Sequence, residues 1–381
     1  MTGRPASLNN PVLMKSFNNS QNSMNRLFHS ILVFLSGTFL VSCSDQPIPE
    51  PQNDVTETLS VNIPAPPTTD GKVTSFDMRS PNAGPTTISV APDNSTIWFT
   101  LSNANAIGRM GPDGENTAEF PVPTPESSPR IIALGSDGNM WFSEHNSGKI
   151  GRITPDGDIT EFDLSSPDSQ PRAIALGSDG NIWIGMFAAN RIGRITPEGE
   201  ITEFDIPTPD SGPRALAAGP DGNIWFSEFK AGKIGRITPD GEITEFILPQ
   251  PQTGPGDITA GADGNMWFLM LNGNMDNTPV IGNRVGRITM SGNVTEFSIP
   301  SEGSTPINIA VGPDRNIWYT KNNTLGRVTP GGEITEFPFA DLPARAVGLS
   351  AGSDRQTPDR LIDRLWFTDP LNNQIGYLQF N

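Results

Sequence analysis

Three arginines occupy equivalent positions in the sequence and could together bind an anion. Arg130, Arg172 and Arg214 each follow a proline directly, and each lies 42 residues from the next. A guanidinium group is a planar fork that matches a carboxylate or a phosphate. If the three arginines lie on neighbouring units of a ring, they form an anion cradle at one mouth of its channel. The alternative is a structural network in which Glu144, Glu228 and other acids of the repeats neutralise them.

A second set of side chains could complete such a mouth or supply oxygen ligands to a metal ion. Its members lie shortly after the same kind of proline or three residues after a tryptophan: Glu144, Glu228, Asp257, Asn308, Arg345 and Asp369. A metal-dependent hydrolase of the lactonase kind would need the carboxylates and the amide of this set to meet in a channel. The repeated Asp-Gly pairs favour turns, because no stretch has the ligand spacing of an EF-hand calcium loop.

Other catalytic motifs are absent from the sequence. The chain has one cysteine and two histidines, and no glycine-rich phosphate-binding loop. His29 lies in an apolar N-terminal segment, so a catalytic triad would depend on His145, which we expect in a turn at the end of a strand. We therefore assign no catalytic residue, and the metal requirement stays undetermined.

The single cysteine follows an apolar run and indicates a lipid anchor. Residues 27–42 read LFHSILVFLSGTFLVS, and Arg26 precedes them. A run of about 16 residues is short for a membrane span and suits a signal peptide. Leu40-Val41-Ser42-Cys43 resembles a bacterial lipobox, which implies lipidation of Cys43. We predict a lipoprotein signal peptide over 1–42, with 1–23 a possible mis-assigned start before Met24. An ordinary signal peptide or an anchor helix is the alternative.

The segment after the cysteine predicts a tether and a location. Residues 43–70 are rich in proline and acids and nearly free of aromatic residues. Such a composition buries too little apolar surface to fold by itself, so we expect a disordered tether to the membrane. Ser44 after the lipidated cysteine favours delivery to the outer membrane over inner-membrane retention. The expected location is extracytoplasmic, on the periplasmic or surface face.

From residue 71 onward the sequence repeats seven times. The seven tryptophans mark the phase at intervals of 42 to 51 residues: Trp98, Trp141, Trp183, Trp225, Trp267, Trp318 and Trp366. Ile-Gly-Arg and Thr-Glu-Phe triplets repeat in step with them. Each unit divides into four short alternating runs separated by turn signals, as in Glu242–Phe246 after Pro-Asp-Gly. The pattern predicts an all-β, seven-bladed β-propeller over 71–381, with four antiparallel strands in each blade.

The two ends of the repeat region are complementary. Lys72–Phe76 matches the fourth strand of a unit, and the chain ends at Ile375–Phe380, which matches a third strand. We expect the N-terminal strand to join the last blade and close the ring, which removes both exposed edges. The tryptophans are expected to pack between blades, and the glycines of Ile-Gly-Arg to permit a close approach of the backbone. The arginines of that triplet are expected to pair with the Thr-Glu-Phe acids or to cap carbonyls of neighbouring blades.

The net charge of the chain limits the classes of molecule that it can bind. The chain carries a formal charge of −17, and without the three basic residues of 1–42 the remainder carries 22 basic and 42 acidic residues, or −20. A surface this acidic repels phosphate backbones, so we expect no nucleic-acid partner. The expected partners are the membrane, through Cys43, and a small anionic or peptide-like ligand. We expect a monomer.

Units such as GPDGNIWFSEFKAGKIGRITPDGEITEF resemble the streptogramin B lyase (virginiamycin B lyase) family over residues 72–380. The resemblance implies a magnesium-assisted carbon–oxygen elimination that opens a cyclic depsipeptide. It also implies a histidine base directly after the proline of the innermost strand in a late blade, a second histidine in the last blade, and nearby glutamates. The matching positions here are Ile307 and Ala344, which can neither accept a proton nor bind metal. Asp369 lies near where the family places an acid.

Two classes of function follow. The first is a ligand- or partner-binding lipoprotein that uses the channel mouth, which the missing histidines favour. The second is an enzyme, either a divergent carbon–oxygen lyase of the streptogramin B type or the lactonase-like hydrolase. Magnesium is expected only if lyase-like activity is retained, and no other cofactor is expected.

Overall fold

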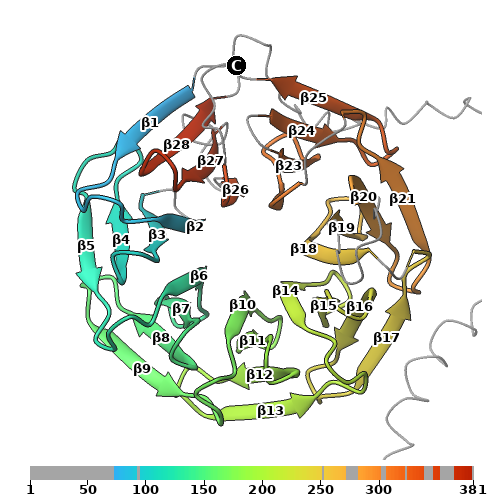
Figure 1. Cartoon of the computed structure of the whole chain (residues 1–381), viewed down its shortest axis with the longest axis horizontal. Coiled ribbons are helices and arrows are strands. Elements are labelled where there is room, and N and C mark those ends of the chain that lie inside the picture. Colours follow the sequence, from blue (N-terminus) through green and yellow to red (C-terminus); the bar gives the residue numbers. More distant parts are fainter. Residues whose placement is uncertain are drawn as a thin grey trace, which may run out of the picture. The chain divides into compact units, whose positions relative to one another are not determined.

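The computed structural model describes residues 73–91, 95–250, 253–271, 282–301, 306–321, 324–338, 346–351 and 364–379. These residues form seven four-stranded antiparallel sheets arranged around a central axis, as Figure 1 shows. The predicted seven-bladed β-propeller is therefore confirmed. The predicted signal peptide, Cys43 and the tether lie outside the described residues. Among the residues described, no helix is long and apolar enough to cross a membrane.

The first four blades follow one another along the chain with nearly constant strand lengths. Blade 1 contains β2 (Pro85–Val90), β3 (Ile97–Leu101), β4 (Ala106–Met110) and β5 (Ala118–Pro121). Blade 2 contains β6 (Pro129–Leu134), β7 (Met140–Glu144), β8 (Lys149–Ile153) and β9 (Ile159–Asp163). Blade 3 contains β10 (Pro171–Leu176), β11 (Ile182–Met186), β12 (Arg191–Ile195) and β13 (Ile201–Asp205). Blade 4 contains β14 (Pro213–Ala218), β15 (Ile224–Glu228), β16 (Lys233–Ile237) and β17 (Ile243–Ile247).

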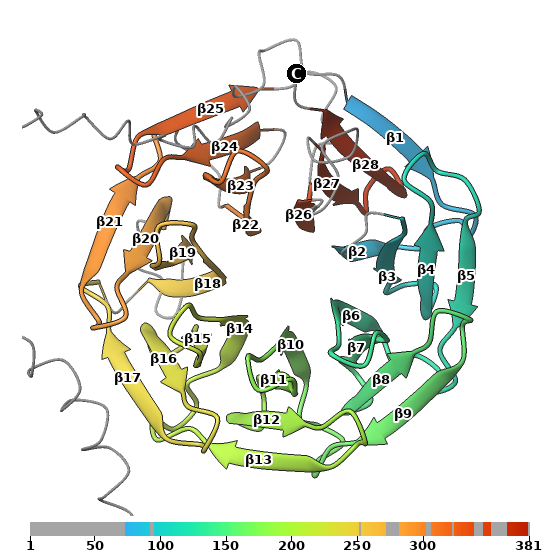
Figure 2. The same ribbon diagram turned by 180° about the vertical axis from the view of Figure 1, so that it is seen from behind.

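The last three blades complete the ring, and the final one uses both ends of the repeat region. Blade 5 contains β18 (Gly254–Ala260), β19 (Met266–Leu271), β20 (Arg284–Ile288) and β21 (Val294–Ser298). Blade 6 contains β22 (Ile309–Val311), β23 (Ile317–Lys321), β24 (Thr324–Val328) and β25 (Ile334–Pro338). Blade 7 contains β26 (Leu349–Ala351), β27 (Arg364–Asp369), β28 (Gln374–Gln379) and β1 (Val73–Asp77). In each blade the first strand lies innermost, as Figure 2 shows from behind.

The ring closes as predicted, by pairing of β1 with β28. Their register runs from Val73 opposite Leu378 to Asp77 opposite Gln374. The predicted closing strand began one residue earlier, at Lys72, which lies outside the described residues. Pairing the two ends in one sheet leaves β28 without a free edge.

The tryptophans form the packing between blades, which confirms their predicted role. All seven tryptophans are buried, and at most 4% of the surface of each residue is exposed. Trp225 stacks on Phe246 of its own blade at a centroid distance of 5.3 Å, and the Arg236 guanidinium lies 5.5 Å from the Trp225 ring. Trp225 also packs against Ile258 and Phe268 of the next blade. The repeated aromatic residues are therefore committed to the core.

Two polar contacts repeat between neighbouring blades. The Ile-Gly-Arg arginines mostly donate to carbonyl groups of the next blade, as Arg152 Nη1 does to Pro197 O at 2.8 Å. The Thr-Glu-Phe glutamates instead accept from the segment that leaves the preceding blade. Glu245 accepts from the Thr208 amide at 3.0 Å and from its hydroxyl at 2.9 Å, while Lys233 Nζ lies 2.9 Å from the same carboxylate. Of the two roles expected for these arginines, carbonyl capping is the common one.

Candidate functional site at the channel mouth

The inner strands carry a distortion at the point where the candidate arginines lie. In blades 2 and 4 the pairing shifts between the first proline and the third residue after it, as between Pro213 and Leu216. A β-bulge of this kind changes the direction of side chains. The Ser227 hydroxyl accepts the amide hydrogen of Ala215 at 3.1 Å, and Ser143 does the same for Ile131. The repeated Trp-Phe-Ser sequence therefore stabilises the bulge that carries Arg214 and Arg130.

The three arginines line one cavity at the start of the inner strands. The cavity consists of two adjoining hollows of about 180 and about 110 Å³. Arg172, Arg214, Asp257 and Asn308 line both hollows, and Arg130 lines the smaller one. We call Arg130, Arg172 and Arg214 the arginine cluster.

A ring of aliphatic side chains lies next to the cluster along the inner strands. One residue from each blade occupies the same register position, opposite the residue that follows the tryptophan. The members of this aliphatic ring are Ile88, Ile132, Ile174, Leu216, Ile258, Ile309 and Leu349, each only 4–8% exposed. All except Ile258 line the larger hollow. The cavity thus combines a polar rim with an apolar floor.

The guanidiniums of the cluster influence one another electrostatically. Burial, and then the charges of Arg214 and Arg130, lower the pKa of Arg172 to about 9. Burial and then Arg130 also lower the pKa of Arg214, although Asp257 opposes the shift. Burial lowers the pKa of Arg130. These shifts fit three cations held close together and away from bulk water. A guanidinium group in a protein is protonated at neutral pH, so the cluster carries its positive charge there.

The described residues do not form the predicted alternative, a structural network of acids that neutralises the arginine cluster. None of the acids among them makes an ion pair with Arg130, Arg172 or Arg214. The Thr-Glu-Phe acids of these blades pair with cations at the start of the third strands instead, as Glu203 does with Arg191 at 3.1 Å. The cluster therefore presents its charge to the cavity.

Two arginines of the cluster lie against a phenylalanine ring, a feature that we did not predict from the sequence. The Arg172 guanidinium lies 5.1 Å from the centre of the Phe187 ring, and Arg214 lies 5.0 Å from that of Phe229. The equivalent residue in blade 2 is His145, and burial followed by the charge of Arg130 lowers its pKa. The spacing in the sequence could have predicted these rings, because each one lies four residues after a tryptophan.

Asp257 and Asn308 meet at the cavity and bind each other. Asp257 Oδ2 accepts from Asn308 Nδ2 at 2.7 Å and from the Ile309 amide at 3.2 Å, and Oδ1 accepts from the Ile258 amide at 3.1 Å. Burial raises the pKa of Asp257 to about 6, against the effects of its amide donors and of Arg214. Asn308 Oδ1 is buried without a hydrogen-bond partner. This pair joins blades 5 and 6 and adds the single described carboxylate that lines the cavity.

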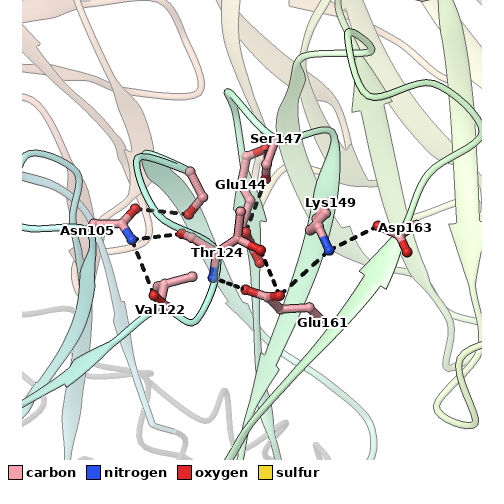
Figure 3. Close-up of polar contacts among 9 residues, drawn as sticks. Asn105, Val122, Thr124, Glu144, Ser147, Lys149, Glu161 and Asp163 are labelled. Atoms are coloured by element: carbon pink, nitrogen blue, oxygen red, sulfur yellow. Dashed lines mark hydrogen bonds and ion pairs between the residues drawn. The ribbon is translucent and has the colours of Figure 1, made fainter.

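Glu144, Glu228 and Asp369, which we expected at the channel mouth, are not among the residues that line the two hollows. Glu144 and Glu228 end the second strands, one strand outward from the channel, and both are fully buried. Figure 3 shows Glu144 beside Ser147, whose hydroxyl donates to Oε2 at 3.1 Å, and near Lys149 and Glu161. Each of the two carboxyl groups lies near one charged residue of the third strand and one of the fourth strand of its own blade.

Asp369 instead organises the turn after β27. Its Oδ1 accepts from the amides of Leu371 and Asn372, both at 3.1 Å, and Oδ2 accepts from Asn372 Nδ2 at 2.6 Å. Of the five oxygen donors that the hydrolase alternative requires, only Asp257 and Asn308 meet. Arg345 and Ala344 lie outside the described residues.

The residues at the mouth do not suit a magnesium ion. Ile307, at the position where the resemblance described above would place a histidine base, lines the smaller hollow. Guanidiniums repel a divalent cation, and the one carboxylate is already engaged by a side-chain amide and two backbone amides. In the described parts of the chain, no three acidic, histidine or cysteine side chains form a cluster able to hold a metal ion. The donor set present therefore matches an anion better than a cation.

Comparison with known proteins identifies relatives of the whole propeller. The family model described as the Virginiamycin B lyase family matches residues 55–276 and 271–381. A solved virginiamycin B lyase from Staphylococcus aureus is 36% identical, with a TM-score of 0.73 over 82% of this chain and 100% of that one. A streptogramin B lyase structure is 34% identical, with a TM-score of 0.72 over 82% of this chain and 98% of that one.

The curated relatives match over a shorter stretch. A virginiamycin B lyase from Bordetella pertussis is 38% identical over 61 residues, which is 16% of this chain and 20% of that protein. The match thus spans about a fifth of that relative's length. The family match, in contrast, covers all seven blades. The chain belongs to the Virginiamycin B lyase family.

Proposed function

We propose that this propeller is a lipid-anchored, extracytoplasmic binding protein that captures a small anionic or peptide-like ligand at its channel mouth. The observation that carries the proposal is the arginine cluster, which faces a cavity without an ion-paired acid among the described residues. Arginine forks bind carboxylate and phosphate oxygens in pairs, and such charged hydrogen bonds are stronger away from water. Two of the guanidiniums, those of Arg172 and Arg214, lie over the rings of Phe187 and Phe229.

Thermal unfolding with a panel of small anions tests this function. A ligand that binds only the folded protein stabilises it by RT ln(1 + [L]/Kd), about 2.7 kcal/mol when it is present at 100 times its Kd. We expect carboxylate- or phosphate-bearing compounds to raise the Tm of the wild-type propeller, and the rise to disappear in Arg214→Gln. A panel that leaves the Tm unchanged, or shifts the variant as much as the wild type, contradicts the proposal.

The second candidate is the lyase reaction that names the relatives, and family membership favours it. A linearisation assay on a streptogramin B with magnesium separates the two candidates, with the Staphylococcus aureus enzyme assayed in parallel. Because Ile307 occupies the position that the resemblance gives to the base, we expect no turnover above the rate without protein. Turnover near the rate of the reference enzyme would make the divergent lyase the better assignment.

The location at the outer membrane rests on the sequence of the N-terminal segment. We expect metabolic labelling with palmitate to mark the full-length chain expressed in a Gram-negative host, and Cys43→Ser to abolish the label. Unchanged labelling of the variant would refute the lipid anchor. Membrane fractionation of the labelled protein then tests whether Ser44 directs it to the outer membrane.

A further inference from the structure

The charge at the channel mouth indicates how many negative charges the ligand carries, which the proposed function leaves open. The cavity is lined by three guanidiniums and, among the described residues, one carboxylate, Asp257. With all four groups ionised, their net charge is +2. Like charges held together away from water repel one another, and a bound ion of opposite charge relieves that repulsion. Two negative charges would neutralise this site.

The shape of the cavity limits the size of the group that carries those charges. Its two adjoining hollows, of about 180 and about 110 Å³, together reach only the lower end of the roughly 300–1,000 Å³ typical of sites for drug-sized ligands. The aliphatic ring forms the floor of the larger hollow and offers no hydrogen-bonding groups there. A bound anion must therefore satisfy its oxygens at the rim, where the guanidiniums lie.

We propose that the ligand group bound by the arginine cluster is a compact dianion with its charge on oxygen atoms, such as a phosphoryl, sulfate or dicarboxylate group. This inference rests on the proposed function and names its ligand class. Neighbouring blades each contribute one fork, so a group with several equivalent oxygens can accept from more than one guanidinium. A monoanion leaves part of the cluster's charge uncompensated and binds more weakly.

Isothermal titration at pH 7.5 and constant ionic strength tests the inference with three probes: sulfate, succinate and acetate. We expect sulfate or succinate to bind at least about tenfold more tightly than acetate. Tighter binding of sulfate indicates a phosphoryl or sulfate group, and tighter binding of succinate indicates a dicarboxylate. If acetate binds as tightly as both, the dianion inference fails while the proposed function stands. If none of the three binds, both fail.

Matched variants show whether the cluster is responsible. Arg172→Gln should weaken binding of the preferred dianion at least about tenfold, because one charged donor pair is lost. Arg172→Lys keeps the charge but not the fork, and should retain part of the affinity and the wild-type Tm. Arg315→Gln removes an exposed arginine in the turn between β22 and β23 and should bind like the wild type. Equal loss in Arg315→Gln and Arg172→Gln would indicate nonspecific attraction and overturn the proposal.

Discussion

Glu228 is a carboxyl group that the fold shields from water. It is fully buried at the end of β15, and burial, followed by the nearby charge of Glu245, raises its pKa to about 8. A carboxyl whose pKa is raised on folding keeps its proton in the folded state after the unfolded chain has released it. Stability therefore falls as the pH rises from the unfolded value near 4.5 to about 8.

Glu228→Gln should remove this pH dependence. We expect the variant to match the wild type at pH 5 and to be more stable at pH 9, by on the order of 2 kcal/mol. Urea unfolding at the two pH values measures the difference. The control is Glu242→Gln, an exposed glutamate in the same blade, which should behave like the wild type at both. Equal stability of wild type and Glu228→Gln at pH 9 would show that Glu228 is ionised in the folded protein without penalty.

Titratable groups at the mouth should make anion binding stronger at low pH. His145, beside Arg130 and Arg172, has a pKa lowered below its ordinary value of 6.5, so it gains its positive charge only in acid. Burial raises the pKa of Asp257 to about 6, so this carboxylate loses its negative charge as the pH falls toward 5.5. Both changes make the mouth more positive, so we expect the Kd for sulfate to fall roughly threefold to tenfold from pH 8 to pH 5.5.

Sulfate is the right probe here because its charge does not change in this range. His145→Phe gives blade 2 the residue type found at the equivalent positions of blades 3 and 4, Phe187 and Phe229. This variant should lose part of the pH dependence while keeping affinity at pH 8, and Asp257→Asn should lose another part. Sulfate affinity that is constant with pH, or weaker in acid, would show that these groups do not act on the site.

At the scale of the strand, the Ile-Gly-Arg glycine is required by the ring that lies across it. Gly235 faces Phe226 on the neighbouring strand, and a Cβ added at Gly235 would lie 2.1 Å from Phe226 Cζ. We predicted that these glycines permit a close approach of the backbone, but the group that lies against Gly235 is the side chain of Phe226. Blade 3 differs, because Ile184 replaces the phenylalanine and a Cβ at Gly193 would meet nothing closer than 3.5 Å.

Because only one of these two glycines lies against an aromatic ring, alanine substitutions at the two positions form a matched pair. Gly235→Ala should destabilise the propeller by about 1–3 kcal/mol through overpacking, whereas Gly193→Ala should have little effect. The free energies of unfolding in urea give the comparison, and Phe226→Leu should rescue Gly235→Ala in part. Equal losses in the two glycine variants would point to the glycine backbone, and not the ring, as the cause.

The strands were more predictable from the sequence than the site. Alternation and turn residues give the strands, and the Trp, Ile-Gly-Arg and Thr-Glu-Phe positions give their order, because packing repeats once in each blade. The direction in which a side chain points at the end of a strand could not be predicted in the same way. Glu228 and Arg214 are neighbours on paired strands, yet one points into the blade and the other into the cavity, since a local bulge decides this.

At the scale of the whole molecule, the ring depends on β1. This strand pairs with β28 along its length, and Phe76 stacks near Trp366 at a centroid distance of 6.3 Å. A chain that begins at residue 71 keeps the strand, and one that begins at residue 79 lacks it. We expect the shorter chain to lose roughly 10 °C in Tm or to aggregate through the free edge. Equal Tm values by calorimetry would mean that closure contributes little to stability.

We infer that the propeller keeps the family fold while its channel mouth binds an anion. Diffraction from crystals grown with selenate, at the selenium absorption edge, tests it most directly because the anomalous signal locates the dianion. We expect a selenate peak within hydrogen-bond distance of guanidiniums of Arg130, Arg172 and Arg214, and its loss in crystals of Arg172→Gln. A cavity without that peak, in which the three arginines form ion pairs with acids of the protein, would show that the mouth does not bind a dianion.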